Sequence, residues 1–296
     1  MKDRIIYFIV KTFWPNKLLV KKRENILKSL FKISTYDRYK SISEKTEVEP
    51  WAFIRVCNEI KTLSASLNSI TPLFKRGVIG YNSCTDGSEE IILNFCKRHP
   101  NFIPLKYEYE VYPCSFGKRI STVPYENTLA AYYNAVLDII PKNEWFMKID
   151  VDHFYFQKIM KHSFTLPKTP RDAVIYSRLD LVRKGDDIRV IKYRRPGDQW
   201  LIFNKDLKFK NTISQDGKIY CEELIMPTKT AKFKPECSNF HFPYEKESRN
   251  FDDDLFYKLE KFEDFMDTAD PNEFSDEVKS IETLHQIIGE FDKQKR

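Results

Sequence analysis

Short apolar runs alternate with longer segments of helical periodicity between Trp51 and Asp150. A short, continuously apolar run predicts a buried strand, and apolar residues three and four positions apart predict an amphipathic helix. Ser88 is expected to cap the second of the predicted helices. The predicted strands span residues 52–56, 78–81, 102–107 and 145–149, and the predicted helices span residues 59–70, 88–97 and 127–140.

This alternation predicts an α/β fold in which parallel strands are joined by right-handed helical crossovers. Ligands of such sheets bind beyond the carboxyl ends of the strands. Polar residues gather at these ends, and three separate loops are therefore expected to meet at one edge of the sheet. The polar residues are Asn58 and Glu59 after the first strand, 82–87 after the second, and Asp150 and Asp152 after the fourth.

The two ends of the chain depart from the alternating pattern. Residues 1–40 carry eleven Lys/Arg and three Asp/Glu, a local balance of +8, whereas residues 247–296 carry seven and fifteen, a balance of −8. We expect three regions: a basic leader (1–48), a catalytic domain (49–246) and an acidic helical extension (247–296). In the leader, bulky apolar residues are interleaved with Lys and Arg, which suits either an interfacial membrane helix or a helix packed on the enzyme body.

Composition narrows the class of protein further. The 23 Phe, 16 Tyr and 42% hydrophobic residues indicate a folded globular protein, and only eight Gly argue against glycine-rich architectures. No apolar run approaches the roughly 20 residues that span a bilayer. The six cysteines form no C-x-x-C pair, which fits reduced thiols in a cytoplasm. We expect peripheral contact with an anionic membrane and no nucleic-acid partner.

Asp150-Val151-Asp152 directly follows the fourth predicted strand. If this segment is extended, its two carboxylates point the same way and repel each other unless a cation intervenes. Carboxylate oxygens suit Mg²⁺ or Mn²⁺, which keep coordination positions open for phosphate oxygens. The motif therefore predicts a divalent metal that neutralises a diphosphate. The acidic run 252–254 is instead expected at the start of a helix, where the helix dipole favours carboxylates.

Four stretches together are more specific than this motif alone: WAFIRVCNE (51–59), GVIGYNSCTDGSEE (77–90), WFMKIDVDH (145–153) and NFHFP (239–243). They resemble the bacterial lipooligosaccharide β-1,4-N-acetylgalactosaminyltransferases that build ganglioside-like glycans. The CTDGS segment is similar to the D-G-S-T-D-G loop of GT-A glycosyltransferases. The resemblance runs from about residue 51 to 244. No family motif matches 108–125, so no role is carried over there. Residues 199–235 also match poorly, and this second stretch is expected to shape acceptor recognition.

The resemblance implies a GT-A fold, a mixed sheet flanked by helices. It further implies UDP-GalNAc as donor, Mn²⁺ or Mg²⁺, inversion at the anomeric carbon, and a galactose of a lipooligosaccharide as acceptor. Such an enzyme would work at the cytoplasmic face of a bacterial inner membrane. Asp86 would accept a hydrogen bond from the uracil or the ribose. Donor-binding residues would be Arg55, Asn58, Glu59, Asn82, Asp86, Lys148 and Asp150, and metal ligands would be Asp150, Asp152 and His241.

The two histidines near these motifs have different expected roles. His241 lies between two phenylalanines, a setting that also suits a core histidine with one satisfied nitrogen. A metal contact is the alternative, because imidazole is a ligand for Mn²⁺. His153 is expected to orient the loop as a partner of a ligand.

Inversion requires a general base that removes the proton of the acceptor hydroxyl. Asp198, in the turn Arg195-Pro196-Gly197-Asp198, is the first choice and Glu236 the second. Glu222, Glu223 and Asp180 remain open. Rival functions are a GT-A transferase that uses another UDP-hexose, a sugar nucleotidyltransferase and a non-enzymatic glycan-binding protein.

Overall fold

The computed structural model describes residues 47–112, 123–195, 198–213, 220–226, 231–233 and 236–293. The chain divides into two compact units, residues 1–46 and residues 47–296, and the second is described below. The predicted basic leader lies outside the described residues except for its last two positions, Glu47 and Val48.

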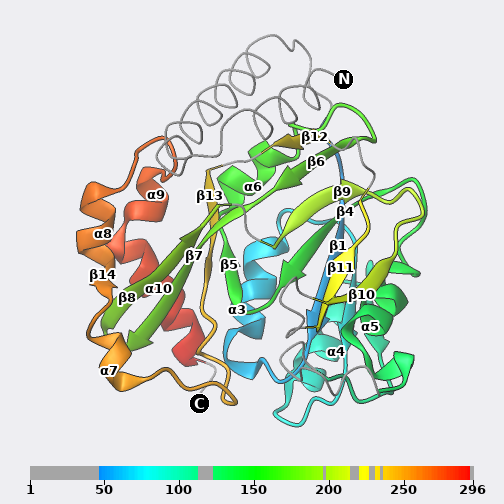
Figure 1. Cartoon of the computed structure of the whole chain (residues 1–296), viewed down its shortest axis with the longest axis horizontal. Coiled ribbons are helices and arrows are strands. Elements are labelled where there is room, and N and C mark those ends of the chain that lie inside the picture. Colours follow the sequence, from blue (N-terminus) through cyan, green and yellow to red (C-terminus); the bar gives the residue numbers. More distant parts are fainter. Residues whose placement is uncertain are drawn as a thin grey trace, which may run out of the picture. The chain divides into compact units, whose positions relative to one another are not determined.

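A seven-stranded mixed sheet forms the centre of the second unit (Figure 1). Its strands, in spatial order, are β12 (Ala231–Phe233), β6 (Asp172–Ile175), β9 (Trp200–Phe203), β4 (Trp145–Asp150), β1 (Trp51–Val56), β2 (Gly77–Tyr81) and β3 (Phe102–Lys106). The four strands predicted from the sequence, β1 to β4, are parallel, as expected. The later strand β9 is antiparallel to both of its neighbours, which makes the sheet mixed.

The predicted helices are present with shifted ends: α3 (Ile60–Ile70), α4 (Ser88–Arg98) and α5 (Leu129–Leu137). Ser88 is the first residue of α4 and not its cap, because Gly87 takes that position with φ of +93°. The third helix is shorter than predicted: the 3-10 turn η2 (Tyr125–Asn127) precedes it, and Thr128 caps α5 by accepting from the Ala131 amide.

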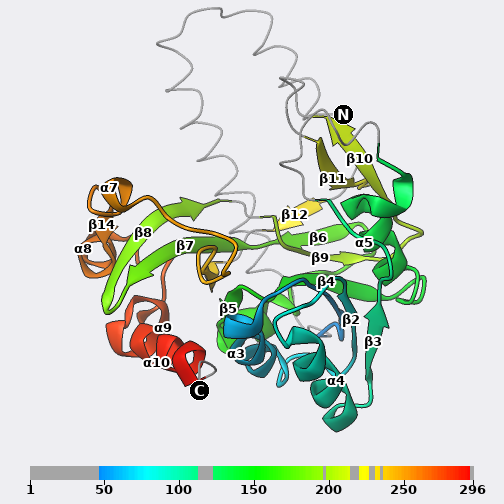
Figure 2. The ribbon, with the colours of Figure 1, turned by 90° about the horizontal axis from the view of Figure 1, so that it is seen from below.

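Helices and a hairpin cover the two faces of this sheet. Figure 2 shows α3 and α4 on one side, and the hairpin of β10 (Phe209–Ile213) and β11 (Tyr220–Leu224) on the other. Phe53 and Val78 on that other side join α5 and the hairpin in one apolar cluster. The predicted α/β class, a mixed sheet flanked by helices, is confirmed.

A second sheet has the order β14 (Glu260–Lys261), β8 (Asp187–Arg194), β7 (Ser177–Lys184), β13 (Cys237–His241) and β5 (His153–Tyr155). The predicted helical tail packs on it, and its helices are α7 (Asp253–Phe256), α8 (Phe262–Thr268), α9 (Asp276–Lys279) and α10 (Ile281–Asp292). Asp252 caps α7 by accepting from the Leu255 amide, so the acidic run lies at a helix start, as expected. None of the helices in the described part of the chain is long and apolar enough to cross a bilayer.

Strand β7 has two different faces. Leu179 and Leu181 belong to the apolar cluster formed with the C-terminal helices. Arg178 and Asp180 alternate with them and are buried on the other face, although both carry charge. Because side chains alternate along a strand, β7 separates an apolar core from a charged site.

Candidate active site

Loops from β1, β2 and β4 meet at the carboxyl edge of the main sheet, as the sequence predicted. Asn58 follows β1 and adopts a left-handed φ of 54°, and Ser83 follows β2 with a φ of 47°. The Asn58 Oδ1 accepts a hydrogen bond of 2.7 Å from the Thr85 amide and joins the two loops. Left-handed backbone at non-glycine residues costs free energy and is concentrated at functional sites. Asn82 is buried between these loops.

Asp86 accepts two backbone hydrogen bonds through its carboxylate. Its Oδ2 accepts from the Ile60 amide at 2.9 Å, and its Oδ1 accepts from the Ser88 amide at 2.9 Å. Burial would raise the pKa of Asp86, but these hydrogen bonds outweigh burial and lower it. Both carboxylate oxygens are thus engaged at the first turns of α3 and α4. The structure shows a capping role for Asp86, and its contact with the uracil or the ribose stays a prediction.

Asp150, the last residue of β4, is surrounded by donors. Lys148, two positions earlier on the same face, donates to Asp150 Oδ2 at 2.6 Å, and Gln199 Nε2 lies 3.2 Å from that oxygen. Arg55 Nε is 3.7 Å from Oδ1. Burial would raise the pKa of Asp150, but the charges of Lys148 and Arg55 outweigh it and hold the pKa well below its ordinary value. Asp150 is therefore an anion with partners among the protein's own cations.

The chain turns sharply after Asp150. The expectation that Asp150 and Asp152 share an extended segment is wrong, because β4 ends at Asp150 and residues 151–152 form a turn before β5. The turn separates the two carboxylates and places Asp152 beside two imidazoles. One ligand atom each from Asp152, His153 and His241 lies within 4.8 Å of the others, a spacing that can hold a metal ion. Asp150 was predicted as a metal ligand but is not part of this group. His153 was predicted only to orient the loop beside a ligand, and it is part of the group.

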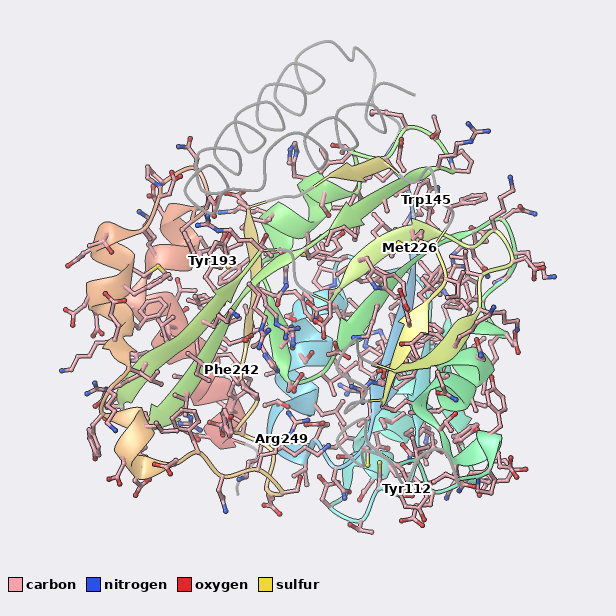
Figure 3. The ribbon with its side chains drawn as sticks, in the orientation of Figure 1. Tyr112, Trp145, Tyr193, Met226, Phe242 and Arg249 are labelled. Carbon is pink, nitrogen blue, oxygen red and sulfur yellow. The ribbon has the colours of Figure 1, made fainter. Side chains whose placement is uncertain are left out.

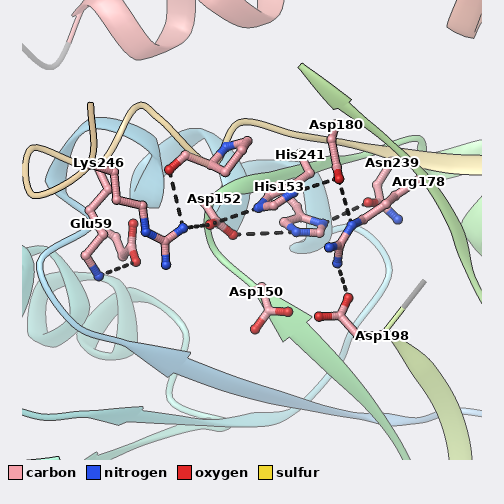
Figure 4. A network of polar contacts seen from close by, with 12 residues as sticks. Glu59, Asp150, Asp152, His153, Arg178, Asp180, Asp198, Asn239, His241 and Lys246 are labelled. Carbon is pink, nitrogen blue, oxygen red and sulfur yellow. Dashed lines mark hydrogen bonds and ion pairs between the residues drawn. The ribbon is translucent and has the colours of Figure 1, made fainter. Parts of the chain in front are cut away.

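His241 bridges two carboxylates (Figure 4). Its Nδ1 lies 2.8 Å from Asp180 Oδ1, and its Nε2 lies 3.2 Å from Asp152 Oδ2. Burial would lower the pKa of His241, but the two carboxylates raise it to about 9. In the metal-free protein His241 is therefore an imidazolium that donates to both. A metal ion at Nε2 would replace that proton.

His153 is fully buried and packs on His241, with ring centroids 4.3 Å apart. Burial and the neighbouring His241 charge lower its pKa to about 4, so the ring is neutral at pH 7. Its Nδ1 lies 2.8 Å from both Asn239 Oδ1 and Gln199 Nε2. Its Nε2 lies 3.3 Å from Gln199 Nε2 and 3.5 Å from Asp152 Oδ1. In the tautomer with the proton on Nδ1, the Nε2 lone pair and the Asp152 carboxylate are two acceptors that suit a cation between them.

Asp180, Arg178 and Asp198 extend the network away from His241. Arg178 Nε donates to Asp180 at 2.9 Å, and its Nη1 donates to Asp198. Burial would raise the pKa of Asp198, but the charges of Lys148 and Arg178 lower it. The Asp198 side chain is 60% exposed, so an acceptor hydroxyl can reach it. Glu222, another of the proposed bases, is partly buried, and its charge acts on Arg55. Asp180 is only 2% exposed, which leaves an acceptor no access to it.

Glu59 lies on the other side of Asp152 and pairs with Lys246 at 2.8 Å. Burial and the charge of Asp152 raise the pKa of Glu59 to about 7. Glu59 therefore lies within reach of the charge of Asp152, and its role in donor binding stays a prediction. Lys246 also donates to the Cys57 carbonyl oxygen.

The structure does not bring Glu236 into this site. Glu236 directly precedes β13, whereas His241 is the last residue of that strand. Five residues at roughly 3.3 Å each separate the two positions by about 16 Å. The charge that acts on Glu236 comes from His162 of α6 (Gln157–Ser163). The proximity of Glu236 to the histidine motif in sequence was therefore misleading.

Several residues of the network were missed or misjudged from the sequence. Arg178 and Gln199 had no predicted role, and neither did Lys246 and Arg249 in the loop after β13. One available signal was the alternation Arg178-Leu179-Asp180-Leu181, because charged residues on one face of an apolar strand indicate a buried polar site. The second was the two cations Lys246 and Arg249, three and six positions after the end of the NFHFP stretch.

The carboxyl edge of the main sheet thus gathers buried acids, two imidazoles and several cations, an arrangement that suits an enzyme of phosphate-containing substrates. A family model, described as "Beta-1,4-N-acetylgalactosaminyltransferase (CgtA)", matches residues 6–291. The chain belongs to this family and is a glycosyltransferase.

Other comparisons add little to this assignment. A search of the curated proteins found no match. A mannosyltransferase from Pyrobaculum calidifontis, solved in complex with GDP-Man and Mn²⁺, is similar at 16% identity and a TM-score of 0.33, over 49% of this chain and 41% of its own. An inositol-1-phosphate CTP transferase from T. maritima is similar at 11% identity and a TM-score of 0.33, over 55% of this chain and 73% of its own. These values are low, and family membership rests on the family model.

Proposed function

We propose that the protein is an inverting, metal-dependent glycosyltransferase that moves GalNAc from UDP-GalNAc to a galactose of a lipooligosaccharide. The observation that carries the proposal is the juxtaposition of Asp152, His153 and His241 at the carboxyl edge of the sheet, within 4.8 Å of one another. The family description supports the donor sugar and the β-linked product. A β product from an α-linked sugar nucleotide requires inversion, and hence a base on the face opposite the leaving diphosphate.

The residues present fit a divalent cation. One carboxylate and two imidazoles offer oxygen and nitrogen ligands that suit Mn²⁺. Buried Asp150 Oδ1 and Gln199 Oε1 have no hydrogen-bond partner among the described residues, and each could therefore accept a contact from a further polar ligand. When bound, such a cation would supply charge neutralisation for the diphosphate.

The chain's own groups would divide the remaining work. Asp198 would accept the proton of the attacking hydroxyl, since it is ionised and half exposed. Asp150 would be held in place by Lys148 and Gln199, whose hydrogen bonds fix its carboxylate. Arg55, beside Asp150 and 5.3 Å from the Tyr133 ring centroid, would add a positive charge near the donor.

Purified enzyme should release UDP from UDP-GalNAc in the presence of Mn²⁺ and a galactosyl acceptor, and a chelator should abolish the release. Asp152→Asn should lose turnover and Mn²⁺ binding while remaining folded. Asp198→Asn should lose turnover but bind UDP with unchanged affinity, because the base does not contact the nucleotide. Release from another UDP-hexose alone would refute the donor assignment. Pyrophosphate release would indicate a nucleotidyltransferase, and binding of glycan without turnover would indicate a lectin-like protein.

We also propose that the enzyme works at the cytoplasmic face of a bacterial inner membrane, with residues 1–40 providing attraction to anionic lipid. The support is the local balance of +8, from eleven basic and three acidic residues, since each basic residue near an anionic surface contributes about 1 kcal/mol. Deleting residues 1–40 should abolish sedimentation with anionic vesicles, and salt should weaken binding of the full chain. Unchanged sedimentation of the truncated protein would refute this proposal.

A further inference from the structure

The loop of residues 242–252, between β13 and α7, is held against the site at three points. The Phe242 amide donates to the Asp152 carbonyl oxygen at 2.8 Å. Lys246 bonds to Glu59 beyond β1, and Glu245 accepts two hydrogen bonds from Arg183 of β7 at 2.6 and 3.2 Å. These side chains are almost fully buried. The loop therefore carries any side chain it bears to a fixed place beside Asp152.

Arg249 is a cation that this loop places beside Asp152, on the side away from His153 and His241 (Figure 4). Figure 3 shows Arg249 at the end of the molecule opposite Trp145, the first residue of β4, and thus on the carboxyl side of the sheet. Its Nη1 lies 3.8 Å from Asp152 Oδ2 and donates to the Pro243 carbonyl oxygen at 3.3 Å. Its side chain is 48% exposed. Arg249 thus differs from Lys246, whose side chain is buried and makes a short hydrogen bond to Glu59.

We propose that Arg249 binds the diphosphate of the sugar nucleotide and stabilises it as the leaving group. The inference rests on the proposed function. A guanidinium matches two phosphate oxygens with parallel N–H donors, and a phosphate offers more charge than one carboxylate. Arg249 would exchange its contact with Asp152 for the diphosphate, and Asp152 would then be available, with His153 and His241, to hold a cation.

The group transfer balances with Arg249 in this role. The bond between the anomeric carbon and the β-phosphate oxygen breaks, and its electron pair stays on that oxygen. The acceptor oxygen forms the new bond, and its proton passes to Asp198. Arg249 donates hydrogen bonds to the oxygen on which charge develops, which lowers the barrier when the donors are already in place.

The alternative is that Arg249 only compensates the charge of Asp152 in the metal-free protein. The two roles differ in what they predict for nucleotide binding. A diphosphate-binding arginine makes affinity depend on the number of phosphates in the ligand. A charge-compensating arginine competes with the metal instead, so its removal would tighten Mn²⁺ binding and leave the phosphate dependence unaltered.

The test is calorimetric titration of the full chain with uridine, UMP and UDP, with Mn²⁺ and without it. Arg249→Gln should leave uridine binding unchanged and weaken UDP binding about 10- to 100-fold, both with Mn²⁺ and without it. Arg249→Lys should recover part of this loss, because lysine keeps the positive charge but lacks the two parallel N–H donors of the guanidinium. Arg171→Gln is the matched control, since Arg171 is exposed and precedes β6, which enters the sheet from the opposite edge.

Equal UDP affinity in the wild type and Arg249→Gln would overturn the inference, and so would tighter Mn²⁺ binding with the same preference for UDP over uridine. A wild-type protein that binds no UDP at all would refute the proposed function instead. Melting temperatures of all variants check that each is folded, and Arg249→Lys provides a second reading if Arg249→Gln is unstable.

Discussion

Asp180 is a single buried carboxylate that holds three cationic groups in place. It accepts from Arg178 Nε at 2.9 Å, from Arg194 Nε at 2.5 Å and from His241 Nδ1 at 2.8 Å. Although burial would raise the pKa of Asp180, these partners hold it far below its ordinary value. By engaging Nδ1, Asp180 turns Nε2 of His241 toward Asp152. Asp180 is thus a positioning residue for the candidate metal ligands.

Asp180→Asn should lower the Mn²⁺ affinity about 10- to 100-fold, as is usual when the partner of a histidine ligand is lost. It should also lower the free energy of unfolding by about 3 kcal/mol, because buried cations lose their counter-ion. Mn²⁺ titration followed by electron paramagnetic resonance and urea denaturation provide the two measurements. Asp187→Asn on β8, whose carboxylate pairs with Arg189 away from the site, is the control. Unchanged Mn²⁺ affinity in Asp180→Asn would contradict the positioning role.

The sequence predicted individual site residues better than their partners. Asp152 and His241 were linked through short motifs, and the structure places them 3.2 Å apart. The contact between Asp180 and His241 depends on the parallel pairing of β13 with β7 across 61 residues, which no local pattern encodes. The capping contact of Asp86 was not predicted for a related reason. Its carboxylate serves the start of α3, 26 residues away, and that contact appears only after β1 and β2 pair.

Strand β2 and helix α5 are two elements that approach each other closely at Gly80. A Cβ atom on Gly80 would lie 2.4 Å from Val136 Cγ2 and 3.0 Å from Tyr132 Cε2. Gly80→Ala should therefore lower the free energy of unfolding by about 1–3 kcal/mol, through overpacking. Gly289→Ala in α10 is the matched control, because nothing lies within 4 Å of its new Cβ. It should stabilise the protein by about 0.5–1 kcal/mol. Urea midpoints give both values, and equal midpoints for the two variants would contradict this picture.

The elements up to β4 follow the local pattern, whereas later ones depend on distant partners. Residues 255–266 have helical spacing, yet the structure interrupts them with β14 between α7 and α8. Glu260 and Lys261 pair there with Val190 and Arg189 of β8, so tertiary pairing overrides the local periodicity. Strand β9 enters the sheet antiparallel for a similar reason, since its neighbours β4 and β6 come from separate parts of the chain.

Arg183 joins three parts of the described chain that lie far apart in the sequence. From β7 it donates to Glu245 in the 242–252 loop and to Asp292 at the end of α10, at 2.7 and 3.0 Å. The acidic extension is therefore tied both to the second sheet and to the loop that carries Arg249. Phe291, adjacent to Asp292, is fully buried in the apolar cluster with Leu179 and Leu181. The C-terminal helices support the site as well as the core.

Arg183→Met should lower the free energy of unfolding by about 2–4 kcal/mol. Removing one partner of a buried ion pair leaves the other charge uncompensated. Glu245 is buried and would remain without a counter-ion. Asp292 is 44% exposed and would regain part of its hydration. The change should also weaken UDP binding, because the loop loses one of its attachments. Lys184→Met is the control: its pair with Asp253, which is 82% exposed, should contribute less than about 1 kcal/mol. Chemical denaturation and UDP titration measure the two effects. If Arg183→Met loses stability but keeps full UDP affinity, Glu245 does not position the loop, and Lys246 with Phe242 suffices to hold it against Asp152.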